Sequence, residues 1–167
     1  MLLKELLSGV PGILETRGDA AVEIQTLVTD SREKAQDGLF FCISGMRFDA
    51  HDFAPQAVAN GCIVLVVEHF VDCPVTQVRV DNARRAMAYI AAAFYGHPAK
   101  KLRMVGVCGT KGKTTTTYLM KAILEKAGFK TGLIGTTGNL IGDRSLPSNM
   151  TTPDPVDLHR CLRQMVD

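Results

Sequence analysis

The 167-residue sequence lacks the features that mark membrane proteins, secreted proteins and zinc-stabilised proteins. Its five cysteines are odd in number and show no C-x-x-C spacing, which argues against a disulfide framework and against structural zinc. No apolar run approaches the roughly 20 residues that a membrane-spanning helix needs. The opening stretch MLLKELLSGVPG is too short and too soon interrupted for a signal peptide. We therefore expect a cytoplasmic protein without a membrane partner.

The sequence also lacks internal repeats, low-complexity tracts and a large net charge, which is only +2. This small charge hides an uneven distribution. Residues 1–98 hold 8 Lys/Arg and 12 Asp/Glu, a net of −4, whereas residues 99–167 hold 11 and 5, a net of +6. An anionic ligand in the second part would explain the basic excess, and so would solvated lysines on helix faces.

The apolar pattern alternates between helix and strand periods, which predicts an α/β fold. Residues 62–69, CIVLVVEH, are almost continuously apolar and β-branched, as in a strand that is covered on both faces. Asn82 is a candidate cap for a helix over residues 83–96. Other strands are expected within 21–32, 37–44 and 75–81, and other helices near 2–7 and 52–60.

The stretch PAKK, which follows Gly96, is the best candidate for a domain boundary. It divides the chain into a first domain, residues 1–98, and a second unit, residues 99–167. The second unit reads as a strand at 105–107, a loop, a helix, a strand within 130–137 and a polar loop up to Thr152. Asp154 and Pro155 then begin a last helix.

The segment from 105 to 128, VGVCGTKGKTTTTYLMKAILEKAG, has the residue types of a phosphate-binding loop. Gly109 and Gly112 allow close approach of a phosphate, Lys113 adds a positive charge, and Thr114 offers a hydroxyl to Mg²⁺. Thr115 can contact a neighbouring phosphate. The alternative is an ordinary strand-to-helix turn with a surface lysine. The apolar positions of the following helix (Leu119, Ile123, Leu124, Ala127) favour the phosphate loop.

The common pattern G-x-x-x-x-G-K-[ST] requires a glycine at position 107, where this chain has Val107. After Gly109 only 58 residues remain, whereas a phosphate-loop fold needs several parallel strands with helices on both faces. A downstream strand with an acidic metal-binding residue is also absent from the sequence. We therefore expect this chain to be a fragment of a longer protein.

Three separated stretches resemble the Mur ligase family, and within it the MurE type. GTKGKTTT resembles the family's ATP loop, G-T-x-G-K-[ST]-[ST], whose first glycine corresponds to Gly109, so Val107 is no defect. Residues 29–62 resemble the N-terminal nucleotide-sugar domain through their D-S-R, G-L-F and D-x-H-x-F segments. TTPDPVDLH resembles the T-T-P-D element, which the MurF and folylpolyglutamate types lack. The resemblance covers nearly the whole chain.

The resemblance implies a fold and an activity. It implies a small α/β nucleotide-sugar-binding domain, followed by the start of a P-loop-type parallel-sheet ATPase domain. MurE-type enzymes use ATP to join a diamino acid, diaminopimelate or lysine, to UDP-N-acetylmuramoyl-L-alanyl-D-glutamate through an acyl phosphate. ATP and Mg²⁺ are thus the expected cofactors, a monomer is expected, and no nucleic acid is expected as a partner. The catalytic residues are expected beyond Asp167, so the isolated chain should not complete the ligation.

The resemblance also assigns residues. Seven residues hold the ATP phosphates, with Thr114 near Mg²⁺: Gly109, Thr110, Lys111, Gly112, Lys113, Thr114 and Thr115. Five contact the muramoyl substrate: Ser31, Ser44, His51, Thr151 and Thr152. Ala50 and Met150 depart from residues common in the family. Two alternatives stay open, another ligase of the Mur superfamily and a non-enzymatic UDP-sugar-binding module.

Overall fold

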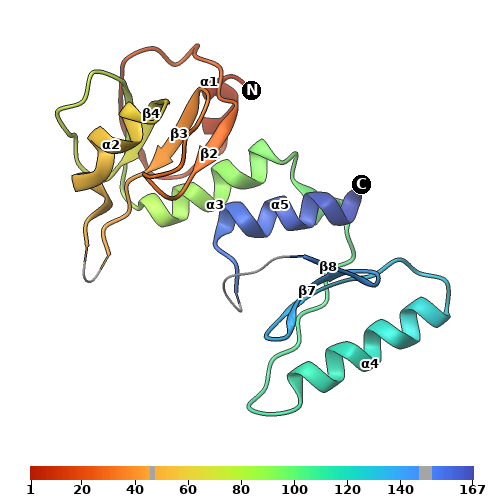
Figure 1. Cartoon of the computed structure of the whole chain (residues 1–167). Coiled ribbons are helices and arrows are strands. Elements are labelled where there is room, and N and C mark those ends of the chain that lie inside the picture. Colours follow the sequence, from red (N-terminus) through yellow and green to blue (C-terminus); the bar gives the residue numbers. More distant parts are fainter. Residues whose placement is uncertain (46–47, 147–151) are drawn as a thin grey trace. The chain divides into compact units, whose positions relative to one another are not determined.

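The computed structural model describes residues 1–45, 48–146 and 152–167 (Figure 1). The chain forms two compact units, Met1–Phe94 and Tyr95–Asp167. The predicted roles of residues 1–98 in substrate binding and of residues 99–167 in ATP binding stay predictions. No helix among the described residues combines the length and the apolar character needed to cross a bilayer.

The first unit contains both strands and helices, as its sequence pattern predicts. Its strands are β1 (Ile13–Arg17), β2 (Thr26–Val28), β3 (Gly38–Phe41), β4 (Cys62–Val67) and β5 (Thr76–Val80). Its helices are α1 (Leu3–Leu7), the 3-10 helix η1 (Ala50–Phe53), α2 (Ala54–Ala59) and α3 (Ala83–Phe94). Among the described strands of this unit, β1 alone was not indicated by the sequence.

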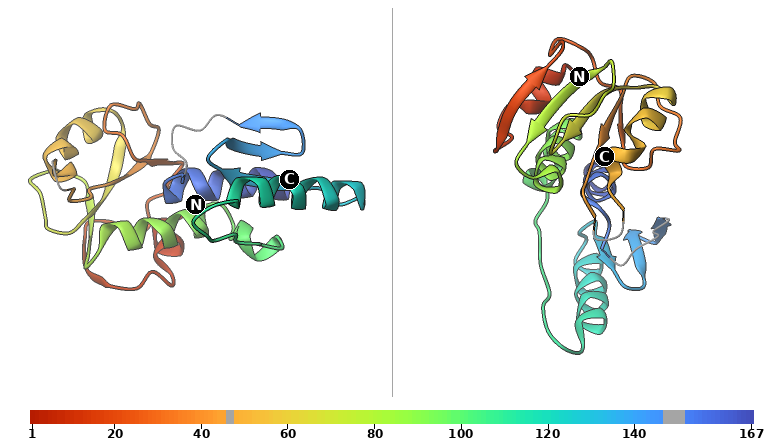
Figure 2. Two further views of the ribbon diagram at one scale, coloured as in Figure 1. Left: turned by 90° about the horizontal axis from the view of Figure 1, so that it is seen from below. Right: turned by 90° about the vertical axis from the view of Figure 1, so that its left-hand side faces the viewer.

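The five strands form one sheet in the order β1-β5-β4-β3-β2 (Figures 1 and 2). The four strands from β2 to β5 are parallel, and β1 pairs antiparallel with β5 at the edge. Parallel strands all end at the same edge of a sheet. The loops that follow β2, β3 and β4 therefore lie at one edge, which is where α/β proteins bind ligands.

Both faces of the central strands are buried, as the apolar run of β4 predicts. On one face Phe40, Leu65 and Val67 pack with α2 residues in a single cluster. The alternate residues of the same strands, among them Leu39 and Val64, point to the other face and are also fully buried. Helix α3 packs against β3 and β4. The sheet is thus a rigid frame for the loops at its carboxyl edge.

The start of α3 confirms the predicted cap. The side chain of Asn82 accepts a hydrogen bond of 2.7 Å from the backbone N–H of Arg85. The carboxylate of Glu68, at the end of β4, accepts another of 2.9 Å from the N–H of Ala83. Two side chains therefore satisfy donors that a helix N-terminus leaves without intrahelical partners.

The second unit contains two long helices and an antiparallel sheet. Its elements are the 3-10 helix η2 (Pro98–Lys101), α4 (Lys113–Lys126), β6 (Gly132–Gly135), β7 (Gly138–Ile141), β8 (Arg144–Leu146) and α5 (Pro155–Val166). The strands pair in the order β6-β7-β8. Helix α5 begins as predicted, because Asp154 accepts a hydrogen bond from the N–H of Asp157 at 2.8 Å.

Two predictions for the second unit were wrong. Residues 105–107 form no strand, because a strand needs a hydrogen-bonded neighbour and none of the described residues pairs with them. The segment expected to be a polar loop up to Thr152 instead contains two strands, β7 and β8, which follow β6 in turn after short connections. The described strands of this unit pair antiparallel and do not belong to a parallel sheet. The parallel sheet of an ATPase domain therefore remains a prediction.

Helix α4 confirms the predicted helix but does not bury its apolar side. Within the described chain Leu119 is 60% exposed and Ile123 is 67% exposed. A polar contact connects the helix to the β6–β7 turn: the hydroxyl groups of Tyr118 and Thr137 form a 2.9 Å hydrogen bond. Lys121 and Glu125 form an ion pair of 2.7 Å along the helix.

Candidate functional site

The candidate phosphate loop leads directly into α4. Gly112 precedes the helix with a φ of 78°, in the left-handed region that glycine adopts without the strain of a side chain. Every residue from 109 to 115 is exposed. The ammonium group of Lys113 turns back over the loop and donates a 2.6 Å hydrogen bond to the carbonyl oxygen of Gly109.

The N-terminus of α4 suits an anion. Its cap position, Gly112, offers no side-chain acceptor, and the first turn contains no acidic residue. By contrast, a side-chain amide and a carboxylate cap α3 and α5 at Asn82 and Asp154. The first N–H groups of α4 therefore point out of the helix end, where the helix dipole favours negative charge. With Lys113 beside them, these donors suit an anionic group such as a phosphate.

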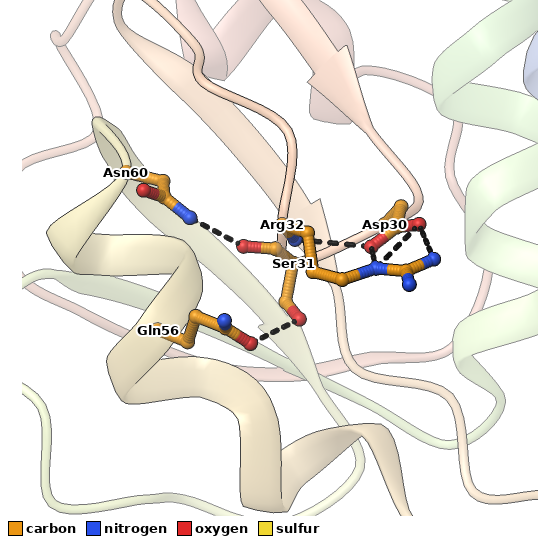
Figure 3. A network of polar contacts seen from close by, with 5 residues as sticks. All are labelled: Asp30, Ser31, Arg32, Gln56 and Asn60. Atoms are coloured by element: carbon orange, nitrogen blue, oxygen red, sulfur yellow. Dashed lines mark hydrogen bonds and ion pairs between the residues drawn. The ribbon is translucent and has the colours of Figure 1, made fainter.

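A second candidate region is the D-S-R turn after β2 (Figure 3). The hydroxyl of Ser31 donates a hydrogen bond of 2.9 Å to the side-chain oxygen of Gln56 on α2. Four residues later, at the C-cap of the same helix, the side-chain amide of Asn60 donates a 2.8 Å bond to the carbonyl oxygen of Ser31. Ser31 is buried, with 8% of its surface exposed. Helix α2 thus fixes the position of this serine.

The two charged residues of the turn pair with each other. The guanidinium of Arg32 donates to both carboxylate oxygens of Asp30, at 2.5 Å from Nη2 and 2.9 Å from Nε (Figure 3). These hydrogen bonds, together with one from the Arg32 N–H, lower the pKa of Asp30 to about 2. The turn therefore presents an ion pair rather than a free cation.

His51 lies in a polar cluster after β3. The residue is 4% exposed, its Nδ1 lies 2.5 Å from a carboxylate oxygen of Asp49, and its Nε2 accepts a 3.0 Å hydrogen bond from the N–H of Glu68. Because Nε2 accepts, the ring proton resides on Nδ1 and is donated to Asp49. The hydrogen bond from the backbone N–H of His51, followed by that from its Nδ1, lowers the pKa of Asp49.

The same cluster brings together three potential metal ligands, Asp49, His51 and His69, with ligand atoms within 4.8 Å of one another. The ring of His69 stacks on that of His51, with 3.9 Å between centroids. A cation would need a lone pair on His51, yet one nitrogen of its ring accepts from the backbone and the other donates to Asp49. The arrangement therefore suits a structural brace better than a metal site.

The remaining predicted substrate residues lie in different environments. Ser44 is exposed after β3, with its hydroxyl 3.4 Å from the Asp49 carboxylate. Thr152 is exposed just before α5, and Thr151 lies outside the described residues. In the first unit the structure therefore brings the Ser31 turn, Ser44 and His51 to one edge of the sheet. The contacts predicted for these residues stay predictions.

Sequence reasoning missed Gln56, Asp49 and His69. Gln56 lies 25 residues from Ser31, and a lone glutamine on a short helix carries no signal of its own. Asp49 is closer to a detectable signal, since it precedes His51 by two residues. The stacking of His69 on His51 depends on the parallel pairing of β3 and β4, which local sequence does not reveal.

Comparison with known proteins gives two family matches. The profile of the Mur ligase middle domain matches residues 107–167. The profile of the Mur ligase family catalytic domain matches residues 23–95. The first match falls within the second unit, the other covers most of the first unit and ends at Tyr95, and together they include most of the chain.

Individual relatives agree with these matches. The chain is 48% identical over all 167 residues to a UDP-N-acetylmuramoyl-L-alanyl-D-glutamate--2,6-diaminopimelate ligase of Geobacillus thermodenitrificans and spans 34% of its length. It is similar in fold to a solved structure of a ligase of the same name, with a TM-score of 0.80 at 22% identity, over 99% of this chain and 33% of that one.

A MurF ligase from Thermotoga maritima, solved in complex with ADP, is similar over 81% of this chain and 29% of its own, with a TM-score of 0.55 and 25% identity. The curated relative and both solved structures are about three times as long as the chain.

Proposed function

The chain belongs to the Mur ligase family, and we propose that it forms the nucleotide-sugar-binding and ATP-binding part of a peptidoglycan-precursor ligase. The whole enzyme would join a diamino acid to UDP-N-acetylmuramoyl-L-alanyl-D-glutamate. The observation that carries this proposal is the 48% identity, over the full chain, to a ligase with that substrate in its name. The same name favours 2,6-diaminopimelate over lysine as the amino acid.

The proposed reaction has two steps. The γ-phosphoryl group of ATP moves to the glutamate carboxylate, which gives an acyl phosphate and ADP. The amine of the diamino acid then attacks the carbonyl carbon, loses a proton and expels phosphate as the amide bond forms. Phosphoryl transfer depends mainly on positioning and on neutralising the charge of the phosphates.

The loop before α4 would supply that positioning and charge. The ammonium of Lys113 would leave the Gly109 carbonyl for the terminal phosphates of ATP. The exposed loop from 109 to 115 and the uncapped helix end would donate backbone N–H groups, and Gly112 keeps the approach open. The Thr114 hydroxyl would bind Mg²⁺, which adds further positive charge.

The carboxyl edge of the first sheet would hold the nucleotide-sugar. Ser31 follows β2, Ser44 follows β3, and His51 braces the loop after β3 against the end of β4. Thr151 and Thr152 would contact the muramoyl-peptide. Since two of the three reactants, ATP and the UDP-linked muramoyl peptide, are nucleotides, we place the enzyme in the cytoplasm. A monomeric state remains part of the proposal.

Calorimetric titration of the 167-residue chain tests the proposal. Binding of both UDP-N-acetylmuramoyl-L-alanyl-D-glutamate and ATP with Mg²⁺ supports a ligase fragment. Binding of the UDP-linked ligand alone favours a non-enzymatic module, and binding of neither contradicts the proposal. Preference for a UDP-muramoyl tripeptide would favour a MurF-type ligase, an alternative that the similarity to MurF structures keeps open. We expect no phosphate release from the chain alone.

A further inference from the structure

We propose that Gln56 is a positioning residue that makes the Ser31 hydroxyl a hydrogen-bond acceptor for the bound nucleotide. Ser31 would then accept from an N–H or O–H of the uridine part and would not donate to a phosphate. This inference rests on the proposed function, because it specifies how the D-S-R turn reads the UDP-linked substrate. Gln56 itself lies on α2, outside the motifs that the sequence indicated.

The geometry places Ser31 between Gln56 on α2 and Asn60, which caps the C-terminus of that helix. The two residues are four positions apart, and both side chains reach the same turn. Gln56 receives the hydroxyl proton of Ser31 at 2.9 Å, and Asn60 holds its carbonyl oxygen at 2.8 Å (Figure 3). These two bonds fix both the backbone and the hydroxyl of a residue that is only 8% exposed.

The hydrogen-bonding capacity of the hydroxyl then sets its ligand partner. A serine hydroxyl has one proton to donate and two lone pairs that accept. Because Gln56 takes the proton, only lone pairs remain. Phosphate oxygens at neutral pH accept and do not donate, so they are poor partners for this atom. The donors of UDP are the uracil N3–H and the ribose hydroxyls.

The neighbouring charges support the same assignment. A phosphate site usually offers an arginine or lysine that is free to form charge-assisted hydrogen bonds. In this turn Arg32 is held by both oxygens of Asp30, and the low pKa of Asp30, about 2, keeps that carboxylate ionised. The turn is therefore electrically balanced, which fits an uncharged part of the nucleotide.

Substitutions at Gln56 separate hydrogen-bond direction from charge. In calorimetric titrations of the full 167-residue chain with UDP, we expect Gln56→Leu to weaken binding about fivefold to tenfold. The affinity of Gln56→Glu for UDP should stay within about threefold of that of the unsubstituted chain, because a carboxylate oxygen can still accept the proton of the Ser31 hydroxyl. Gln56→Lys, which can only donate, should be as weak as Gln56→Leu.

Simple electrostatics predicts the opposite order, since a lysine attracts the diphosphate and a glutamate repels it. Tighter binding by Gln56→Lys than by Gln56→Glu, or unchanged binding by Gln56→Leu, would overturn the proposal. Gln164→Leu is the matched control, because Gln164 is an exposed helical glutamine in the second unit. Circular dichroism should first show that each variant is folded.

Three further ligands identify which hydrogen-bond donor of UDP contacts the Ser31 hydroxyl. CDP lacks the N3–H, and 2′-deoxy-UDP lacks a ribose hydroxyl. One of them should bind the unsubstituted chain more weakly than UDP does, and Ser31→Ala should remove that difference. Pyrophosphate should bind both chains equally, and weaker binding by Ser31→Ala would place a phosphate on Ser31 and overturn the proposal. If the unsubstituted chain does not bind UDP at all, the proposed function fails with it. If it binds UDP without dependence on Gln56, only this inference fails.

Discussion

The ammonium group of Lys113 lies 2.6 Å from the carbonyl oxygen of Gly109, four residues before it, and so closes the candidate phosphate loop on itself. The loop thereby holds its own cation where the phosphates of a nucleotide would lie. A carbonyl is a weaker partner for an ammonium group than a phosphate is. The contact therefore keeps the lysine in place without preventing its transfer to ATP.

Removing this charge should weaken nucleotide binding at the candidate loop. We expect Lys113→Ala to weaken ATP·Mg binding by at least tenfold, because the phosphates lose a charge-assisted partner worth about 1.5–3 kcal/mol. Calorimetry on the isolated chain measures the change. Lys126→Ala, at the other end of α4, is the control and should bind as the unsubstituted chain does. If the two variants bind ATP·Mg with equal affinity, the loop is not part of the ATP site.

Cysteine reactivity gives a second test of the same loop. Cys108 directly precedes Gly109 and is exposed, whereas Cys42, Cys62 and Cys161 are buried. Burial raises the pKa of Cys42 to about 12 and that of Cys62 to about 11, so these thiols stay protonated and unreactive.

We expect a thiol reagent at pH 8 to modify Cys108 first, and ATP·Mg to slow that reaction severalfold. Mass spectrometry of the labelled peptides locates the modified residue. Cys73, which is partly buried in the first unit, serves as the internal control, because its labelling should not respond to ATP. Labelling of Cys108 at the same rate with and without nucleotide would contradict the assignment.

The ion pair of the D-S-R turn predicts a pH dependence. In this pair, the hydrogen bonds from Arg32 lower the pKa of Asp30 from 3.8 to about 2. Since the folded state has the lower pKa, the pair favours folding above about pH 4, and this contribution is lost as the pH falls through about 2. In an NMR titration of the Asp30 carboxyl, Arg32→Ala should return the midpoint toward 3.8. An unchanged midpoint would show that Arg32 is not the cause.

The brace formed by His51 should matter for stability. His51→Ala leaves the N–H of Glu68 and the carboxylate of Asp49 without their partner, so we expect a loss of about 2–4 kcal/mol in the free energy of unfolding. Urea denaturation measures it. The exposed neighbour His69 provides the comparison, and His69→Ala should cost less than about 1 kcal/mol. Similar losses for both variants would show that His51 is no brace.

The elements that could be predicted from sequence are those whose local pattern and tertiary setting agree. The buried strand β4, the capped helix α3 and the Asp154–Pro155 start of α5 each carry a strong local signal. Strand β1 was missed because ILETR is short, lies at a sheet edge and is mostly exposed. Residues 105–107 have a strand-like pattern, but pattern alone forms no strand without a neighbour to accept its hydrogen bonds.

The candidate site divides in the same way. The glycines and lysine of the phosphate loop are contiguous, so their spacing was visible in the sequence. The partner of Ser31 was not visible, because Gln56 reaches it only through the packing of α2 beside the turn after β2. Contacts between side chains that are distant in sequence depend on how the elements pack, and the local sequence pattern does not determine that packing.

A crossed calorimetric experiment tests whether one chain holds two separate nucleotide sites. Ser31→Ala and Lys113→Ala chains are each titrated with UDP-N-acetylmuramoyl-L-alanyl-D-glutamate and with ATP·Mg. We expect Ser31→Ala to weaken binding of the UDP-linked ligand only and Lys113→Ala to weaken binding of ATP only. Equal weakening of both ligands by each substitution, or no change in either affinity, would contradict two separate sites.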